Sequence, residues 1–269
     1  MEVEAQDQQN DQRGIHKMKN NRGEIRILPD LSALYRAAAE AFIEEANRAV
    51  RARGVFHVAL SGGSTPKGIY SLLVNDDTLR EQMPWDETQF WWGDERHVPP
   101  DHPDSNYRMA NEVMLSHASI PSSNIHRIHA ENPNASQAAL DYETALRSAF
   151  LLAPPAMPQF DFILLGMGSE GHTASLFPGT KALNETTRLV VSNWVGKLYT
   201  WRITFTAPLI NNAQRVMFLI AGEDKALALK GVLEGPYEPA QLPAQLIQPT
   251  NGQLVWLLDP KAAAQLTPQ

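Results

Sequence analysis

The chain has 269 residues, with 23 Lys and Arg against 30 Asp and Glu, a net charge of −7, 43% hydrophobic residues and no cysteine. The length suits one large α/β domain, and the lack of cysteine excludes disulfides, thiolate metal sites and cysteine nucleophiles. The acidic balance argues against nucleic acid as a partner, because such surfaces need clustered Lys and Arg. No apolar stretch approaches the roughly 20 residues of a membrane span and no signal-peptide pattern is present, so a soluble cytoplasmic protein is expected.

The first 22 residues are rich in Gln, Asn and alternating charge, which predicts a disordered tail before a single domain over residues 23–269. Met18, within this tail, is an alternative start of the protein. The first expected strand covers residues 25–28. Asp30 is a residue type that caps helix N-termini, and apolar residues at helical spacing continue from it to Gly54, a residue type that often ends helices.

Apolar runs of strand type alternate with helical patterns through the rest of the chain. Helices are expected from Pro66 through Leu73, over residues 106–115 and over about 136–150. Strands are expected over residues 55–60, 90–92, 160–165, 189–191, 202–206, 216–220 and 254–258. This alternation predicts an α/β fold whose mostly parallel sheet is covered by helices on both faces.

A glycine loop, Ser61–Thr65, joins the strand expected at 55–60 to the next helix. Ligands of open α/β sheets bind beyond the carboxyl ends of the strands, where helix N-termini offer free N–H groups to anions. Gly62 and Gly63 allow close approach of the backbone, and Ser64 adds a hydroxyl donor, so the loop is interpreted as a phosphate site. It lacks the Gly-Lys-Ser/Thr of a nucleoside triphosphate loop, which favours a small phosphorylated metabolite. The alternative is a tight turn with Pro66 at the first helical position.

The turn Gly93–Arg96 places two carboxylates and a guanidinium after the strand at 90–92. Arg96 is able to donate two parallel hydrogen bonds to a phosphate or carboxylate, which a lysine does not match. The alternative interpretation is a surface salt-bridge cluster. Pairs of histidines follow at 97 and 102 and at 126 and 129, but no third ligand stands at a convincing spacing, so no metal is expected.

The strand at 160–165 is followed by Gly166–Gly171, which matches the dinucleotide pattern G-x-G-x-x-G. A dinucleotide site also needs an acidic residue about 20 positions on, and none ends the strand at 189–191, so hydride transfer is disfavoured. His172 directly follows Gly171 and precedes an expected first helical turn. A helix N-terminus disfavours the imidazolium, so His172 is expected to be a neutral base, with Glu170 orienting its ring or holding a water molecule.

Taken together, these motifs resemble the 6-phosphogluconolactonase family, which is related to glucosamine-6-phosphate deaminase/isomerase. The resemblance covers roughly residues 25–260 in order and rests on Leu60–Pro66, Gly93–Arg96 with 98–100 and 104–106, Leu165–Pro178, Arg202–Asn211 and Gly222–Ala226. It implies a Rossmann-like three-layer α/β sandwich of the sugar-phosphate isomerase/lactonase type. The His-Thr-Ala-Ser-Leu-Phe-Pro segment favours a lactonase over a deaminase.

The resemblance implies hydrolysis of 6-phospho-D-glucono-1,5-lactone, a step of the oxidative pentose phosphate pathway, without a cofactor or metal. It makes His172 the general base, Arg96 and Lys197 ligands of the anionic substrate, and residues 62–64 part of the phosphate site, with Arg202 as a further candidate. The sequence departs from the family in two places: Glu170 stands where Asp is usual, and Leu-Tyr follows Lys197 where Pro-Pro is common.

The expected partner is a small-molecule sugar phosphate lactone, with no nucleic acid and no membrane, and the expected state is a monomer or weak homodimer. Two alternative functions stay open at this point. One is an amino-sugar-phosphate deaminase/isomerase, in which a similar base moves a proton between C1 and C2. The other is a non-catalytic sugar-phosphate-binding protein.

Overall fold

The computed structural model describes residues 9–10 and 14–267. The strands of the main sheet are β1 (Gln9–Asn10), β2 (His16–Asn20), β3 (Gly23–Ile27), β4 (Phe56–Leu60), β5 (Thr88–Trp92), β7 (Phe162–Leu165), β10 (Arg215–Ile220) and β11 (Gln253–Leu258). A second sheet contains β6 (Asp94–Arg96), β8 (Val190–Val195) and β9 (Thr200–Phe205). The helices are α1 (Leu31–Arg53), α2 (Ser64–Asn75), α3 (Asp77–Gln82), α4 (Asn106–Val113), α5 (Ala135–Ala149), α6 (Ala207–Asn211) and α7 (Ala226–Glu234).

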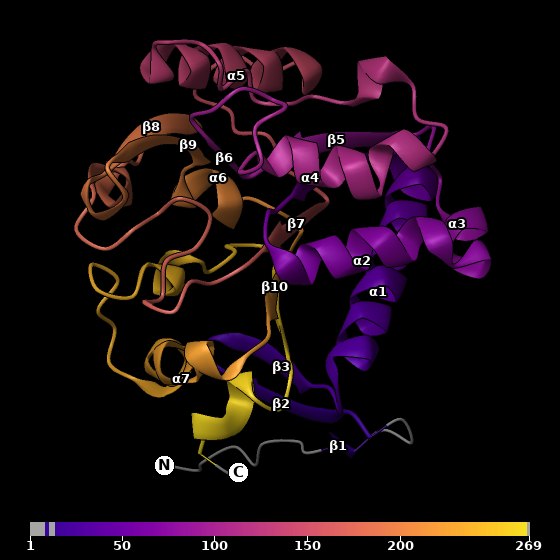
Figure 1. Ribbon diagram of the computed structural model, residues 1–269, viewed down its shortest axis with the longest axis vertical. Coiled ribbons are helices and arrows are strands. Elements are labelled where there is room, and N and C mark those ends of the chain that lie inside the picture. The colour runs from indigo at the N-terminus through magenta and orange to yellow at the C-terminus, as the bar shows by residue number, and fades with distance from the viewer. Residues whose placement is uncertain (1–8, 11–13, 268–269) are drawn as a thin grey trace.

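The main sheet has the strand order β1-β2-β3-β11-β10-β7-β4-β5, and every neighbouring pair from β3 to β5 is parallel. Helix α1 lies on one side of this sheet and α7 on the other (Figure 1). The central strand β7 is buried at all four positions, as expected for a parallel strand covered on both faces. The mostly parallel α/β fold predicted from the sequence is confirmed.

Two of the expected strands do not join the main sheet. Residues 189–191 and 202–206 contribute to β8 and β9, which pair with each other in antiparallel fashion, and β9 also pairs with β6. The chain crosses from the main sheet to this second sheet at Gly93, directly between β5 and β6, where the Gly93 N–H donates to the carbonyl of Leu60. The spacing of apolar residues in the sequence does not indicate that the chain changes sheets here.

Helix α1 begins and ends as its sequence predicts. The Asp30 side chain accepts a hydrogen bond from the N–H of Ala33, and Gly54 ends the helix with a positive φ of 76°. Its buried face packs Leu34, Ala38 and Phe42 into the core that it shares with the sheet. None of the helices within the described residues is both long and apolar enough to cross a bilayer.

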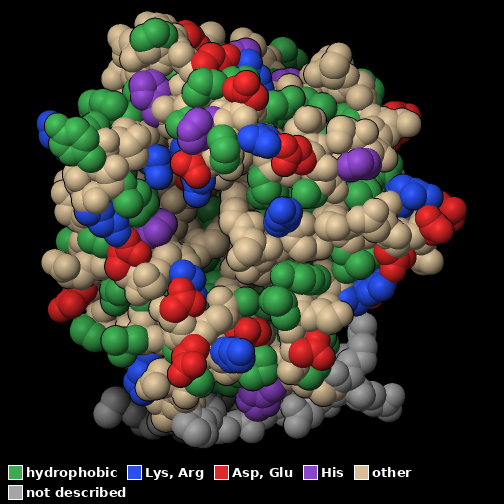
Figure 2. Space-filling model, viewed as in Figure 1, with side chains coloured by type: hydrophobic (Ala, Val, Ile, Leu, Met, Phe, Trp, Pro, Cys, Tyr) green, Lys and Arg blue, Asp and Glu red, His purple; other side chains and the backbone are tan. Residues whose placement is uncertain are grey.

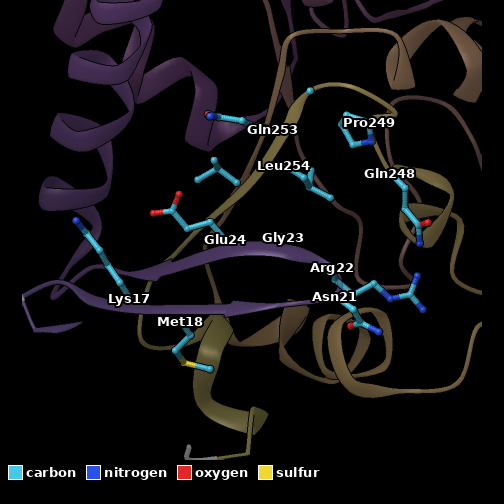
Figure 3. A pocket seen from close by; sticks show the side chains of 12 residues that line it. Lys17, Met18, Asn21, Arg22, Gly23, Glu24, Gln248, Pro249, Gln253 and Leu254 are labelled. Carbon is cyan, nitrogen blue, oxygen red and sulfur yellow. The ribbon is translucent and has the colours of Figure 1, made fainter. Parts of the chain in front are cut away.

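The prediction of a disordered tail through residue 22 is wrong for its last part. Residues His16–Asn20 form β2, which pairs antiparallel with β3 through a tight turn at 21–22, and Met18 is buried against the core. Backbone pairing and this one apolar side chain order a segment that composition alone marks as polar. The hairpin borders a hollow opposite Gln253 and Leu254 (Figure 3). The tail prediction for residues 1–8 and 11–13 lies outside the described residues.

A partly buried histidine lies on β4, next to the edge strand β5 of the main sheet. His57 of β4 accepts a hydrogen bond from the indole N–H of Trp91 at 3.3 Å, and its ring centroid is 4.1 Å from that of Phe150. Burial, together with the charges of His126 and Arg53, lowers the pKa of His57 from 6.5 to about 4. The folded protein therefore holds this imidazole neutral under conditions in which an unfolded chain protonates it.

We expect the free energy of unfolding to decrease as the pH falls from 6.5 to 4. In this range His57 is protonated in the unfolded chain but stays neutral in the folded protein. The contribution of this one group is on the order of 3 kcal/mol. Urea unfolding at a series of pH values measures the slope, and His57→Phe should reduce it even though the variant loses the Trp91 hydrogen bond. An unchanged slope in His57→Phe would contradict this assignment.

Candidate active site

Three loops of the predicted site meet at the carboxyl ends of neighbouring parallel strands. Strands β7, β4 and β5 are consecutive in the sheet, and they end at Gly166, at the Ser61–Thr65 loop and at Gly93. A Cβ on Gly166 would lie only 4.0 Å from the Ser61 hydroxyl, which shows how close the first two loops are. The molecular surface is hollowed between the second sheet and the start of α2, and blue Lys and Arg side chains border the hollow (Figures 1 and 2).

Within this region a cavity of about 200 Å³ collects charged side chains from four segments of the chain. It is lined by Asp94, Arg96, Glu170, His172, Ala174, Ser175, Phe177, Lys197, Leu198 and Arg202. Five residues predicted from the sequence therefore lie together: His172, Glu170, Arg96, Lys197 and Arg202. Strand β6 explains the absence of Glu95 from this lining, because successive side chains of a strand point to opposite faces.

Glu95 points away from the cavity and holds the N-terminus of α4. Its carboxylate accepts hydrogen bonds from the N–H groups of Arg96, Asn106 and Tyr107 and from the Ser105 hydroxyl, at 2.8–3.0 Å. Burial raises the pKa of Glu95 despite these hydrogen bonds, which favour the charged form. The carboxylate pair expected from the sequence is thus divided: Asp94 faces the cavity, whereas Glu95 has a structural role.

Asp94 is fixed by hydrogen bonds from two other segments. Its Oδ2 accepts from the Ser175 hydroxyl at 2.6 Å, and its Oδ1 accepts from the Asn106 side-chain amide at 3.2 Å. The same amide donates to the backbone carbonyl of Asp94 at 2.9 Å. Asp94 is therefore a rigid negative charge at the base of a cavity with several cations.

His172 is mostly buried, with a side chain that is 25% exposed. Burial lowers the pKa of His172 from 6.5 to about 4; the charge of Asp94 opposes this shift, and the charges of Lys225, Arg202 and Arg96 add to it. The expected helix after His172 is absent, since residues 173–176 form a turn closed by a β-bridge between Thr173 and Leu176. Burial, with a contribution from nearby cations, therefore keeps the imidazole neutral. The prediction that a helix N-terminus does so is wrong, because no helix begins at His172.

Tertiary hydrogen bonds replace that helix. Ser175 donates its backbone N–H to the Thr204 hydroxyl and its own hydroxyl to Asp94, and Ala174 adopts a positive φ of 45°, which interrupts helical geometry. These contacts come from the second sheet, which the local sequence of the segment does not reveal.

Glu170 and Lys197 complete one side of the cavity. Oε2 of Glu170 lies 3.1 Å from Nδ1 of His172, and Oε1 forms an ion pair with Lys197. Nδ1 of His172 is buried and has no hydrogen-bond partner, so its contact with Glu170 is electrostatic. Gly168 leaves room for the imidazole, because a Cβ there would lie 2.1 Å from Nδ1.

Arg96 and Arg202 face each other across the antiparallel pair of β6 and β9, at directly opposed positions. Among the described residues neither forms an ion pair, and their guanidinium groups donate only to the carbonyl oxygens of Asp104 and Trp201. Burial, followed by the charge of Arg96, lowers the pKa of Arg202. Like charges at opposed positions destabilise a β pair, so this arrangement favours binding of an anion.

The glycine loop lies beside the cavity and does not line it. A Cβ on Gly62 would overlap the amide oxygen of Asn106, the residue that holds Asp94. Gly63 has a φ of 107° and precedes α2, whose N-terminus receives no side-chain cap; Ser64 is exposed at its first position. The N–H groups of this helix end therefore receive no side-chain cap, and the phosphate site predicted at this loop stays a prediction.

Three residues at or near the cavity were not predicted from the sequence. Ser175 and Phe177 line the cavity, and the charge of Lys225, which follows β10, acts on the pKa of His172. The order of strands supplies the missing information for Lys225, because β10 neighbours β7. Across the parts of the chain that the structure describes, no group of three or more His, Asp and Glu side chains is suited to a metal ion.

The sequence matches the family model described as glucosamine-6-phosphate isomerases/6-phosphogluconolactonase over residues 29–256. The chain belongs to this family. It is 42% identical to the 6-phosphogluconolactonase of a Nostoc species over 244 residues, which cover 90% of this chain and 98% of the relative. It is also 42% identical to the 6-phosphogluconolactonase of a Synechocystis species over 246 residues, with 91% and 99% covered.

Solved structures of the family agree with this placement. The 6-phosphogluconolactonase from Trypanosoma cruzi superimposes with a TM-score of 0.79 at 30% identity, covering 91% of this chain and 97% of the other. A monomeric glucosamine-6-phosphate deaminase superimposes with a TM-score of 0.76 at 19% identity, covering 90% and 99%. The deaminase shares the fold, whereas the sequence similarity lies with the lactonases.

The structural role of Glu95 is testable by Glu95→Gln. The amide keeps the volume, but it loses the charge that strengthens the hydrogen bonds to the α4 N-terminus, and it turns a donor toward N–H groups. We expect the free energy of unfolding to fall by about 2–4 kcal/mol at neutral pH. The matched control is Glu112→Gln on the exposed side of the same helix, where an Arg108 ion pair contributes less than about 1 kcal/mol. Equal losses in the two variants would refute the role of Glu95.

Proposed function

We propose that this chain hydrolyses 6-phospho-D-glucono-1,5-lactone to 6-phospho-D-gluconate, with water activated by His172. The observation that carries the proposal is a partly buried, neutral imidazole in a cavity bordered by two guanidinium groups that have no carboxylate partner among the described residues. Family membership and the similarity to 6-phosphogluconolactonases supply the substrate class. A lactone is an activated ester, so this chemistry requires neither a covalent nucleophile nor a metal.

In the proposed reaction the Glu170 carboxylate, 3.1 Å from Nδ1 of His172, favours the tautomer that carries the proton on Nδ1. Nε2 then accepts a proton from a water molecule as the oxygen of that water forms a bond to C1 of the lactone. The tetrahedral oxyanion is stabilised by the cations around His172. Collapse of this intermediate breaks the bond between C1 and the ring oxygen, and the imidazolium returns its proton to that oxygen as it becomes the hydroxyl at C5.

The phosphate of the substrate is assigned to the cationic border of the cavity. Arg96, Arg202 and Lys197 bind the anionic substrate, and the N-terminus of α2 with Gly62, Gly63 and Ser64 contributes backbone N–H groups. Binding this remote group orients C1 toward His172. A bound dianion also offsets the arginines and Lys225, whose charges lower the pKa of His172, and so makes the imidazole a stronger base when substrate is present.

The monomeric or weakly dimeric state, the cytoplasmic location and the absence of nucleic acid as a partner stay predictions from the sequence. A deaminase is separated from a lactonase by its product, since it releases ammonia from glucosamine 6-phosphate. We expect no ammonia from this chain.

His172→Ala should lower the enzyme-catalysed rate of lactone hydrolysis by about 10²–10⁴-fold, because it removes the general base. The assay generates the lactone in place and subtracts its spontaneous opening. His117→Ala, at an exposed histidine that follows α4, is the matched control and should keep the wild-type rate. Near wild-type turnover by a folded His172→Ala variant would show that another group activates the water.

Arg202→Met should raise KM for the lactone by about tenfold or more and change kcat less, because the guanidinium binds the substrate in the ground state and the transition state alike. Inorganic phosphate should inhibit the wild-type enzyme competitively and the variant only weakly. Arg36→Met serves as the control, since Arg36 lies on α1 and pairs with Asp76 at the surface. A KM that stays at the wild-type value in Arg202→Met would exclude Arg202 from the anion site.

A further inference from the structure

Phe177 contacts the proposed base and one of the proposed substrate cations at the same time. Its side chain is 5% exposed, and its ring stacks on that of His172 with centroids 4.0 Å apart and planes 21° apart. Nζ of Lys197 lies 4.9 Å from the centroid of the same ring. Phe177 also forms part of the border between the catalytic cavity and an adjoining hollow of about 970 Å³.

No hydrogen bond between described residues fixes the imidazole of His172. Nδ1 has no hydrogen-bond partner, although a catalytic histidine ordinarily has its ring oriented by a bond from that nitrogen. Its close contacts are the Glu170 carboxylate 3.1 Å from Nδ1, Gly168 along one edge of the ring and the ring of Phe177 against its face. The Glu170 carboxylate faces one edge of the ring, and packing against Phe177 fixes the plane of the ring.

We propose that Phe177 is a positioning residue that fixes the plane of the His172 imidazole by stacking and holds the Lys197 ammonium beside it through a cation–π contact. This inference rests on the proposed function for its kinetic consequence, and its effect on the His172 ring is independent of that function. A stacked aromatic pair and a cation–π contact each contribute beyond the burial of apolar area, so a leucine of similar bulk does not replace the ring.

Phe177 also excludes water from one face of the imidazole, in an environment that contains many charges. The groups that face His172 are Asp94 and Arg96 of β6, Arg202 of β9, Lys225 after β10, Glu170 of its own loop and Lys197 at the tip of the β8–β9 hairpin. Removing the ring admits water, which weakens the desolvation that dominates the titration of His172. The imidazole then rotates more freely and becomes easier to protonate.

The experiment compares the wild-type protein with Phe177→Leu, Phe177→Ala and the control Phe218→Leu. Phe218 is an equally buried phenylalanine that stacks on Trp256, with centroids 3.9 Å apart, and it does not line the cavity. NMR titration of labelled histidine follows the His172 ring without substrate, and His172→Gln identifies its resonances. Steady-state lactone hydrolysis gives kcat and KM for the same four proteins.

In the wild-type protein the His172 ring protons should be shifted upfield by the stacked ring, and the imidazole should titrate near pH 4. Phe177→Leu should abolish the upfield shift and raise KM. Phe177→Ala should in addition move the titration midpoint toward 6.5 and lower kcat about tenfold, because the base is misplaced. Phe218→Leu should lose thermal stability but keep the wild-type titration and kinetics.

The proposal is overturned if Phe177→Leu keeps the upfield shift and the wild-type kcat and KM. This variant is sufficient for the test even if Phe177→Ala does not fold. The proposal is equally overturned if Phe218→Leu moves the His172 titration as much as Phe177→Ala, because general loosening of the core then explains both. A wild-type protein that shows the stacked, depressed titration but no lactonase turnover refutes the proposed function and leaves the positioning of the ring intact.

Discussion

Two guanidinium groups at directly opposed positions of an antiparallel pair repel each other, and this repulsion organises the site. Arg96 and Arg202 occupy such positions, are partly buried and lack ion-pair partners among the described residues. The fold accommodates them because Glu95, on the other face of β6, anchors the strand to the N-terminus of α4, and Asp94 is held by Ser175 and Asn106. These contacts hold two like charges close together, an arrangement that favours binding of an anion.

The same cations affect the chemistry of His172. Burial and neighbouring positive charge lower the pKa of His172 to about 4, which keeps the imidazole neutral over the physiological range. In the proposed reaction a bound phosphate dianion offsets the positive charges but not the burial, so substrate binding raises the basicity of His172 through electrostatics, with no need for a conformational change. Glu170 joins the two functions, because its two oxygens contact His172 and Lys197.

The sequence predicted those parts of the fold that local patterns determine. Asp30 and Gly54 bound α1, and the parallel strands follow from their apolar runs, so the meeting of the loops after β4, β5 and β7 followed too. Contacts between distant segments were not predictable from such patterns. The second sheet, the turn after His172 and the β2 strand all depend on tertiary hydrogen bonds, such as those of Ser175 with Thr204 and Asp94. The division between Asp94 and Glu95 was implicit in strand alternation, once residues 94–96 are known to be a strand.

The crossing of the chain at Gly93 separates the origins of the site's components. His172 and Glu170 come from a loop of the main sheet, whereas Lys197 and Arg202 come from the β8–β9 hairpin, whose tip is exposed. Under the proposed function, substitutions at that tip change the anion site and leave unchanged the parallel strands that carry His172. The hairpin is therefore the part of the cavity wall that can vary in sequence without disturbing the parallel sheet, whose loop carries His172.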